Sequence, residues 1–205
     1  MSFETTPVYF DNELLLRVRN YTHVTSEAVT DEDIQFYFEQ AENDIEASSG
    51  RKYVSTTKTE TRDGDDTVII VLENTPLISI ESLVVGTTSK ASTKYVFYSE
   101  GKLELVDGTL FTKTTTRQNV VINYTYGDVD NFQNVQNLAF YMVCLKVLQS
   151  SGTYEAQGAT SEKFESYSVN YGGGQPYSGL AKDLQTQIAK LADIVGAKTI
   201  KYGIF

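Results

Sequence analysis

Apolar residues recur at three- and four-residue steps in three parts of the chain, which is the pattern of an amphipathic helix. The first predicted helix spans residues 31–49, because Thr30 suits an N-cap, an acidic first turn follows it, and Gly50 suits the left-handed position after a helix. The second spans residues 131–150 and the third residues 179–196. The apolar face of the third helix includes Leu180, Leu184, Ile188 and Leu191.

Between the first two predicted helices, the pattern changes to short runs of Thr, Val, Ile and Tyr separated by turn residues, which is typical of an antiparallel sheet. Turns are predicted at Asp63-Gly64, at Asp107-Gly108 and over residues 86–92. The predicted strands are residues 52–61, 67–72, 78–85, 95–98, 102–105 and 120–126. Together they form a predicted β subdomain, residues 52–127, inserted between helices.

The predicted fold class is α+β, with one domain over residues 1–205 in which a helical bundle carries the inserted antiparallel β subdomain. Residues 153–179 are polar, contain Gly172-Gly173-Gly174 and keep neither period, which predicts a long loop or extended arm with a glycine hinge. No element is assigned to the first 29 residues. Three helices supply a modest core and the arm has little to pack on, as in a subunit that completes its burial against neighbours.

The net charge of −10 argues against tight nucleic-acid binding, which depends on Lys and Arg replacing phosphate counterions. The same charge suits a surface that DNA slides past, although ordinary solubility explains it equally well. No apolar run is long enough to cross a membrane, and Glu4 stands where a signal peptide would carry Lys or Arg. Cys144 lies among apolar residues and is expected to be a small core residue, which suits a reducing cytoplasm.

Few residues suit catalysis or metal binding. His23 is the only histidine, so we expect a loop residue and no histidine-based catalytic or metal site. The acidic stretch 62–66 lacks the spacing of a calcium loop and favours a hairpin turn. The glycines at 172–174 are not followed by the Lys of a phosphate-binding loop. The sequence therefore predicts no catalytic residue, no cofactor and no metal.

The fourteen tyrosines and ten phenylalanines leave one competing function open, a non-enzymatic β module that binds a ligand by stacking. There is no tryptophan, and tyrosine is also enriched at protein interfaces. Core or interface use of these aromatic residues is favoured.

Four stretches of the chain occur in a characteristic order. Residues 30–53 are the acidic-capped helix that ends at Gly50-Arg51 and leads into the β region, and residues 75–83 are a strand after a proline. Residues 120–127 are a strand that ends in Tyr126-Gly127 directly before a helix, and residues 165–171 precede the last helix. In this order they resemble the head-to-tail connector (adaptor) proteins of tailed bacteriophages and related archaeal tailed viruses, over about residues 30 to 190.

The resemblance implies a virion structural protein without enzymatic activity, assembled in the host cytoplasm and located at the neck. It implies a homo-oligomeric ring, a dodecamer, that joins the portal protein to a stopper or tail-completion protein and extends the DNA channel. DNA would pass through the lumen without specific binding, and acidic residues there would repel its phosphates. Another virion ring component, such as a stopper or tail-completion protein, is the alternative within this class.

Contacts with the portal or with neighbouring copies are expected in two places. The first is the extended segment before the last helix, with Glu165, Tyr167, Val169 and Tyr171. The second is the last helix, with Leu180, Leu184, Ile188 and Leu191. An exposed extended segment can add a strand to a partner's sheet through backbone hydrogen bonds.

Overall fold

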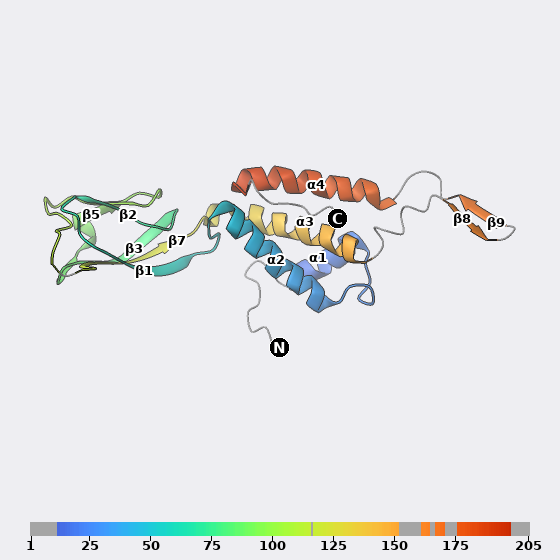
Figure 1. Ribbon diagram of the computed structural model, residues 1–205, viewed down its shortest axis with the longest axis horizontal. Helices are drawn as coiled ribbons and strands as arrows, with labels where there is room; N and C mark the ends of the chain where they lie inside the picture. Colours follow the sequence, from blue (N-terminus) through green and yellow to red (C-terminus); the bar gives the residue numbers. More distant parts are fainter. Residues whose placement is uncertain (1–11, 116, 152–160, 165–166, 171–175, 198–205) are drawn as a thin grey trace. The chain divides into compact units, whose positions relative to one another are not determined.

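The chain separates into two compact units, one with the helices and a short hairpin of two strands, and one with the remaining strands (Figure 1). The computed structural model describes residues 12–115, 117–151, 161–164, 167–170 and 176–197, and between 161 and 178 it describes the backbone alone. The helical unit contains the chain up to Ser49 and from Gln133 onward, and the β unit contains Gly50–Phe132. The predicted α+β class is confirmed.

The described residues contain four α-helices: α1 (Asn12–Thr22), α2 (Asp31–Ser49), α3 (Phe132–Ser150) and α4 (Pro176–Val195). α2 has the predicted bounds and α3 starts one residue later than predicted. α4 starts three residues earlier, with Pro176 at the first helical position, where a missing N–H breaks no hydrogen bond. None of these helices is both long and apolar enough to cross a membrane.

A reciprocal cap fixes the start of α2. The Asp33 N–H donates to the Thr30 hydroxyl oxygen at 3.1 Å, and the Thr30 N–H donates to the Asp33 carboxylate at 3.1 Å. The Thr30 hydroxyl also donates to this carboxylate, at 2.8 Å, and this bond lowers the pKa of Asp33. This is a capping box with Asp in place of Glu, and it satisfies two backbone donors that a helix start leaves free.

α1 was not predicted. Its buried residues Leu14, Val18 and Thr22 recur every four residues, which is helical spacing. The pattern is obscured by the run Leu14-Leu15-Leu16, in which Leu14 is 2% exposed and Leu16 is 61% exposed. A continuous apolar run does not show which of its members faces the core.

Side-chain contacts connect the helices of this unit. The Tyr21 ring of α1 meets the Phe140 ring of α3 edge-on, with 5.6 Å between centroids. The Tyr37 hydroxyl of α2 donates to the Ser150 hydroxyl at the end of α3, at 2.8 Å. α3 is the most buried helix, with nine buried residues, and it supplies the centre of the unit's core.

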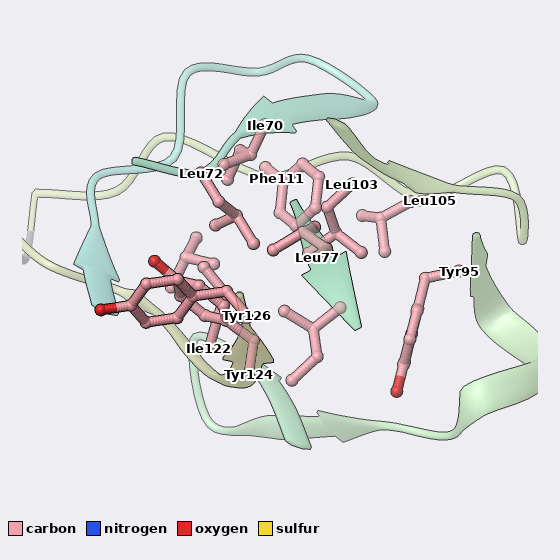
Figure 2. Close-up of a cluster of buried hydrophobic side chains, with 12 residues drawn as sticks. Ile70, Leu72, Leu77, Tyr95, Leu103, Leu105, Phe111, Ile122, Tyr124 and Tyr126 are labelled. Atoms are coloured by element: carbon pink, nitrogen blue, oxygen red, sulfur yellow. The ribbon is translucent and has the colours of Figure 1, made fainter. Parts of the chain in front are cut away.

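The β unit is a sandwich of two antiparallel sheets. The first sheet has the order β1-β7-β3-β4, formed by β1 (Thr56–Arg62), β7 (Val120–Tyr126), β3 (Leu77–Val85) and β4 (Thr88–Lys90). The second has the order β2-β6-β5, formed by β2 (Ile69–Val71), β6 (Lys102–Leu105) and β5 (Tyr95–Phe97). Apolar side chains of both sheets meet between them, among them Ile122 and Leu77 of the first and Leu103 and Tyr95 of the second (Figure 2).

Two predictions about turns were wrong. Residues 86–92 were predicted as a turn, but Thr88–Lys90 forms β4, and only Gly86 and Thr87 connect it to β3. Residues 62–66 were predicted as a hairpin turn, but β1 pairs with β7 and β2 pairs with β6. The stretch therefore crosses from one sheet to the other, which turn composition alone does not reveal.

Part of the predicted loop or extended arm, residues 153–179, has regular structure. β8 (Ser161–Phe164) and β9 (Tyr167–Asn170) form an antiparallel hairpin within residues 153–179, in register from Ser161–Asn170 to Phe164–Tyr167. Gly172-Gly173-Gly174, the predicted hinge, lies outside the described residues. A period of two over only four residues is too short to stand out from a polar loop.

Candidate functional site

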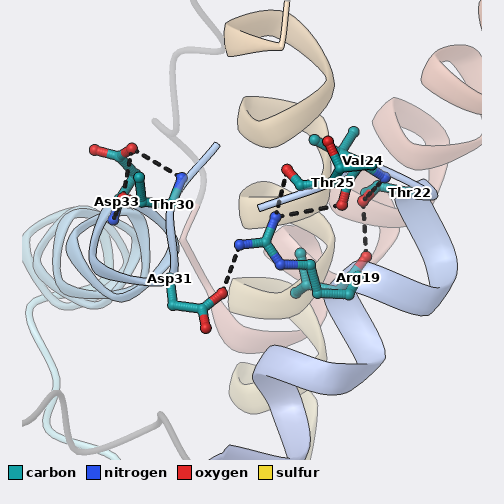
Figure 3. A network of polar contacts seen from close by, with 8 residues as sticks. Arg19, Thr22, Val24, Thr25, Thr30, Asp31 and Asp33 are labelled. Atoms are coloured by element: carbon teal, nitrogen blue, oxygen red, sulfur yellow. Dashed lines mark hydrogen bonds and ion pairs between the residues drawn. The ribbon is translucent and has the colours of Figure 1, made fainter. Parts of the chain in front are cut away.

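An arginine fixes the corner between α1 and α2 (Figure 3). The Arg19 guanidinium donates to the carbonyl oxygens of Val24 and Thr25 at 3.3 and 3.1 Å, and to the Asp31 carboxylate at 2.5 Å. The Thr22 hydroxyl donates to the Val18 carbonyl at 2.8 Å. Arg19 is 14% exposed, so these contacts hold the loop structurally and leave the guanidinium little freedom to bind a ligand.

α2 carries the densest negative charge of the helical unit. It contains seven acidic residues and no Lys or Arg: Asp31, Glu32, Asp33, Glu39, Glu42, Asp44 and Glu46. All seven are exposed or half-buried, while its buried residues are Ile34, Phe38, Ala41 and Ile45. The helix therefore turns an apolar face inward and an acidic face outward.

The chemically richest cluster of the β unit surrounds Glu60, which is 5% exposed. Its carboxylate accepts hydrogen bonds from the Tyr124 hydroxyl at 2.7 Å, from the Glu73 N–H at 3.2 Å and from the Arg62 guanidinium. The Asn74 amide donates to the Tyr124 oxygen at 2.9 Å. Burial raises the pKa of the Tyr124 hydroxyl above its ordinary value. The buried carboxylate is thus committed to structural hydrogen bonds.

The edge strand β1 continues this cluster. Lys58, Glu60 and Arg62 alternate along its inward side, opposite Tyr124, Ile122 and Val120 of β7. Lys58 and Arg62 pair with Glu73 at 2.9 and 3.6 Å. Inward-pointing charges on an edge strand are a known protection against pairing with a foreign strand, because pairing would bury them. This edge is therefore unsuited to accept another strand.

The acidic residues in the loop between β1 and β2 also have structural partners. The Asp63 carboxylate accepts from the Gln118 N–H, and the Asp66 carboxylate accepts from the Lys113 N–H at 2.7 Å. The buried Asn119 accepts from the Gly64 N–H at 2.8 Å. These contacts join the loop to Lys113, Gln118 and Asn119. No group of metal-binding side chains occurs in the described parts of the chain.

Another ion pair lies at the opposite edge of the first sheet, on β4. Lys90 contacts the Asp107 carboxylate at 3.1 Å and the Thr109 hydroxyl at 2.8 Å, and both charged side chains are nearly covered. The hydrogen bond from the Thr109 hydroxyl, with help from Lys90, lowers the pKa of Asp107 to about 2. This group fixes the turn after β6 to the edge strand β4.

The two residues considered for nucleophilic or base chemistry lie apart from any such cluster. His23 follows α1 with φ 57°, and its N–H donates to the Arg19 carbonyl at 2.9 Å, so it ends the helix. Cys144 is buried in α3, and burial raises the pKa of its thiol far above the usual range. A thiol held protonated in this way is unreactive.

The residues predicted to make partner contacts lie in three different settings. Tyr167 and Val169 belong to β9, whereas Glu165 and Tyr171 lie outside the described residues. In α4, Leu184 and Ile188 are fully buried and Leu180 and Leu191 are half-buried. The buried pair supplies the unit's own core, and a contact role for any of these residues stays a prediction.

The segments that enter and leave the β unit lie together. The Asp128 N–H donates to the Lys52 carbonyl at 2.8 Å, and the Asp128 carboxylate pairs with Arg51 at 3.2 Å. Gly127 has φ 139°, and a Cβ there would lie 2.3 Å from the Val54 carbonyl oxygen. The Tyr126-Gly127 junction noticed in the sequence thus has a steric reason.

The two sheets present contrasting outer faces. Strand partners lie on the same side of a sheet, so the outward residues of β1 and β7 are Thr57, Thr59, Thr61, Val121, Asn123 and Thr125, joined by Ser79, Ser82 and Val84 of β3. We call this set the threonine face. The outward residues of the second sheet are Ile69, Val71, Val96, Lys102 and Glu104, which we call the valine face. Neither face was predicted, because their residues come from strands far apart in the sequence.

No known protein family and no curated protein matches the chain by sequence. Among solved structures, it is similar to a chain in the neck of a native GTA particle computed with C12 symmetry, at 13% identity over 93% of this chain and 91% of that chain, with a TM-score of 0.47. A chain in the virion of a native gene transfer agent particle has 14% identity over 86% of this chain and 98% of that chain, with a TM-score of 0.48. A third, in the neck of an empty GTA particle computed with C6 symmetry, has 14% identity over 91% and 93%, with a TM-score of 0.46.

Proposed function

We propose that the chain is a structural subunit of a virion neck, a head-to-tail connector that forms a ring between the portal protein and a stopper or tail-completion protein. The observation that carries the proposal is the order of the pieces. The capped α2, the inserted β unit, the Tyr126-Gly127 junction and α4 follow one another as the connector resemblance implies. The helices before and after the β unit belong to one helical unit, and the β unit is inserted between them.

The hydrogen bonds of the acidic side chains also support a structural role. Glu60, Asp63, Asp66 and Asp107 all accept hydrogen bonds from neighbouring parts of the same unit. Catalysis needs groups that are available to a substrate in a common cleft. We therefore propose no enzymatic activity.

The hairpin of β8 and β9 is the proposed contact element. It forms a sheet of only two strands of four residues each, and such a hairpin is marginally stable by itself. Its outer edges can offer backbone N–H and C=O groups to a strand of a partner. We propose that this hairpin and the neighbouring α4 contact the portal or the adjacent copy, with Tyr167 and Val169 as contact residues.

The acidic face of α2 is the proposed wall of the DNA channel. Carboxylates repel the phosphates of duplex DNA, so the wall would let DNA pass without capturing it. Tight, salt-sensitive binding of duplex DNA by the assembled ring would contradict this assignment.

The competing function, a ligand-binding β module, receives less support. Of the tyrosines in the β unit, Tyr53, Tyr95, Tyr124 and Tyr126 are buried. Tyr98 is 40% exposed, and the Lys102 ammonium lies 4.8 Å from its ring centroid. Most of these aromatic rings thus serve the core instead of a stacking platform.

The test is the mass and shape of the full chain, alone and mixed with the portal protein of its virus, by light scattering and negative-stain electron microscopy. We expect rings, or a monomer that joins the portal stoichiometrically. A variant lacking residues 159–172, which removes the hairpin, should lose portal binding while its circular dichroism and thermal unfolding stay close to those of the full chain. A monomer indifferent to the portal would overturn the proposal.

A further inference from the structure

The threonine face differs in charge from the rest of the molecule. Its residues are Thr, Ser, Asn and Val, whereas 21% of the whole chain is charged and the net charge is −10. The face carries one carboxylate, that of Glu81 in β3, which accepts hydrogen bonds from the Ser79 and Thr125 hydroxyls, each at 2.5 Å. Copies of a strongly acidic chain repel one another, so they approach most easily through surfaces that carry few acidic side chains.

The side chains of this face are already held in place. Thr57 and Thr125 share a hydroxyl contact at 3.3 Å, and the Thr59 hydroxyl donates to the Asn123 side-chain oxygen at 2.5 Å. The Asn123 amide donates to the Ser82 hydroxyl at 2.8 Å. Short, mutually bonded side chains lose little conformational entropy when a partner covers them. The face is therefore preorganised for contact with a protein.

The chemistry of the face disfavours other occupants. It lacks the Lys and Arg that bind phosphates, and it lacks the aromatic rings on which bases or sugars stack. A sheet surface with few charges suits another sheet surface with few charges.

The valine face has the matching character. Val71 is 63% exposed and Val96 is 43% exposed, and the only charges between them, Lys102 and Glu104, pair with each other at 2.7 Å. The two faces are the opposite outer sides of one sandwich, because the core lies between the two sheets. A contact between unlike, opposite faces repeats from copy to copy, which is a heterologous geometry, and it forms a ring when the rotation between copies closes.

We propose that the threonine face of one copy packs on the valine face of the next copy in the ring. This inference rests on the proposed ring and adds the surface that joins its subunits. The three strands that form the threonine face lie about 4.8 Å apart, and about seven residues of each cover roughly 350 Å² in total. A standard interface takes roughly 800 Å² from each partner, so the helical unit must supply the remainder and the isolated β unit should not dimerise firmly.

The test introduces a charge on each face of the full chain. Thr59→Lys and Val71→Lys each place an unpaired ammonium in the proposed contact, and each should raise the protein concentration needed for half-assembly at least about tenfold. The matched control is Thr87→Lys, which adds the same charge at the exposed turn between β3 and β4, outside both faces. Thr59→Ser, which keeps the hydroxyl, should assemble like the wild type.

Light scattering and negative-stain images measure assembly, and thermal unfolding checks that each variant is folded. If the wild type forms rings and both lysine variants assemble as the control does, the inference is wrong and the proposed function stands. If the wild type forms no ring, either alone or on the portal, both are wrong. Loss of assembly in the two face variants, with the control unaffected, supports the inference.

Discussion

The Tyr124 hydroxyl holds together the polar cluster inside the β unit. It donates to Glu60 and accepts from Asn74, so its removal leaves a buried carboxylate oxygen and an amide group without this partner. Leaving buried polar groups unsatisfied costs about 1–3 kcal/mol each.

We therefore expect Tyr124→Phe to lower the free energy of unfolding by about 1–3 kcal/mol in urea titrations followed by tyrosine fluorescence. Tyr95→Phe is the matched control, because Tyr95 lies in the same core and no hydrogen bond of its hydroxyl is found among the described residues. Equal effects of the two substitutions would show that the hydroxyl cluster contributes nothing specific.

Asp107 makes the stability of the β unit depend on acid. Its pKa is about 2 in the folded protein against an ordinary 3.8, so the unfolded chain takes up the proton first as the pH falls. The carboxylate therefore stabilises the fold above about pH 4, and this contribution is lost as the pH falls from about 4 to about 2.

Asp107→Asn should remove this contribution, so that the unfolding free energy of the variant depends less on pH between 4 and 2. Urea unfolding at pH 5, 3 and 2 measures it. Thr109→Val removes the main hydrogen bond and should give an intermediate pH dependence. If the unfolding free energy of Asp107→Asn changed with pH as steeply as that of the wild type, the prediction would be wrong.

At the scale of single residues, the sequence allowed the role of Thr30 to be predicted but not that of Glu60. A helix cap depends on neighbours within three residues, all visible in the local sequence. Glu60 depends on Tyr124, which lies sixty-four positions away and is brought to it by strand pairing. For the same reason, the acidic stretch 62–66 was wrongly interpreted as a hairpin turn.

Among the elements, the end of β7 is the most constrained. A side chain at Gly127 would place its Cβ 2.3 Å from the Val54 backbone oxygen, at a φ of 139° that other residues rarely adopt. A side chain at position 127 would therefore cause both a steric clash with the Val54 backbone and strain in its own backbone.

Gly127→Ala should therefore destabilise the β unit by more than about 3 kcal/mol, as measured by chemical unfolding. Gly86→Ala is the control, since Gly86 also has a positive φ of 62° but a Cβ there would meet nothing within 4 Å. Its cost should be about 1 kcal/mol. Equal costs would mean that the approach to Val54 is easily relaxed.

The predictability of each element followed its length and its contrast with its surroundings. α2, β6 and β7 have the predicted bounds, because caps or alternating burial mark their ends. β4 and the hairpin of β8 and β9 were missed, because three or four residues are too few for a period to show. The prediction of six strands also did not reveal that they divide between two sheets, since local patterns do not encode pairing partners.

For the whole molecule, the division into two units predicts independent folding. The β unit is one continuous segment, Gly50–Phe132, with its own core between two sheets. A fragment of residues 50–132 should fold alone, with a cooperative urea transition and the circular dichroism of a β protein.

Leu103→Ala within the fragment tests whether that fold is the native one, since Leu103 is fully buried. It should lower the fragment's stability by about 2–5 kcal/mol. A fragment without a cooperative transition would show that the β unit depends on the helices.

The hydrogen bond between Lys52 and Asp128 has a consequence for inheritance. The chain enters and leaves the β unit through adjacent segments. Any insert whose two ends lie a few ångströms apart would therefore fit the helical unit. Recombination could exchange one such insert for another without rerouting the helices. Lineages that share the helical scaffold are then free to diverge most where the insert lies, so that sequence similarity fades in the middle of the chain before it fades at the ends.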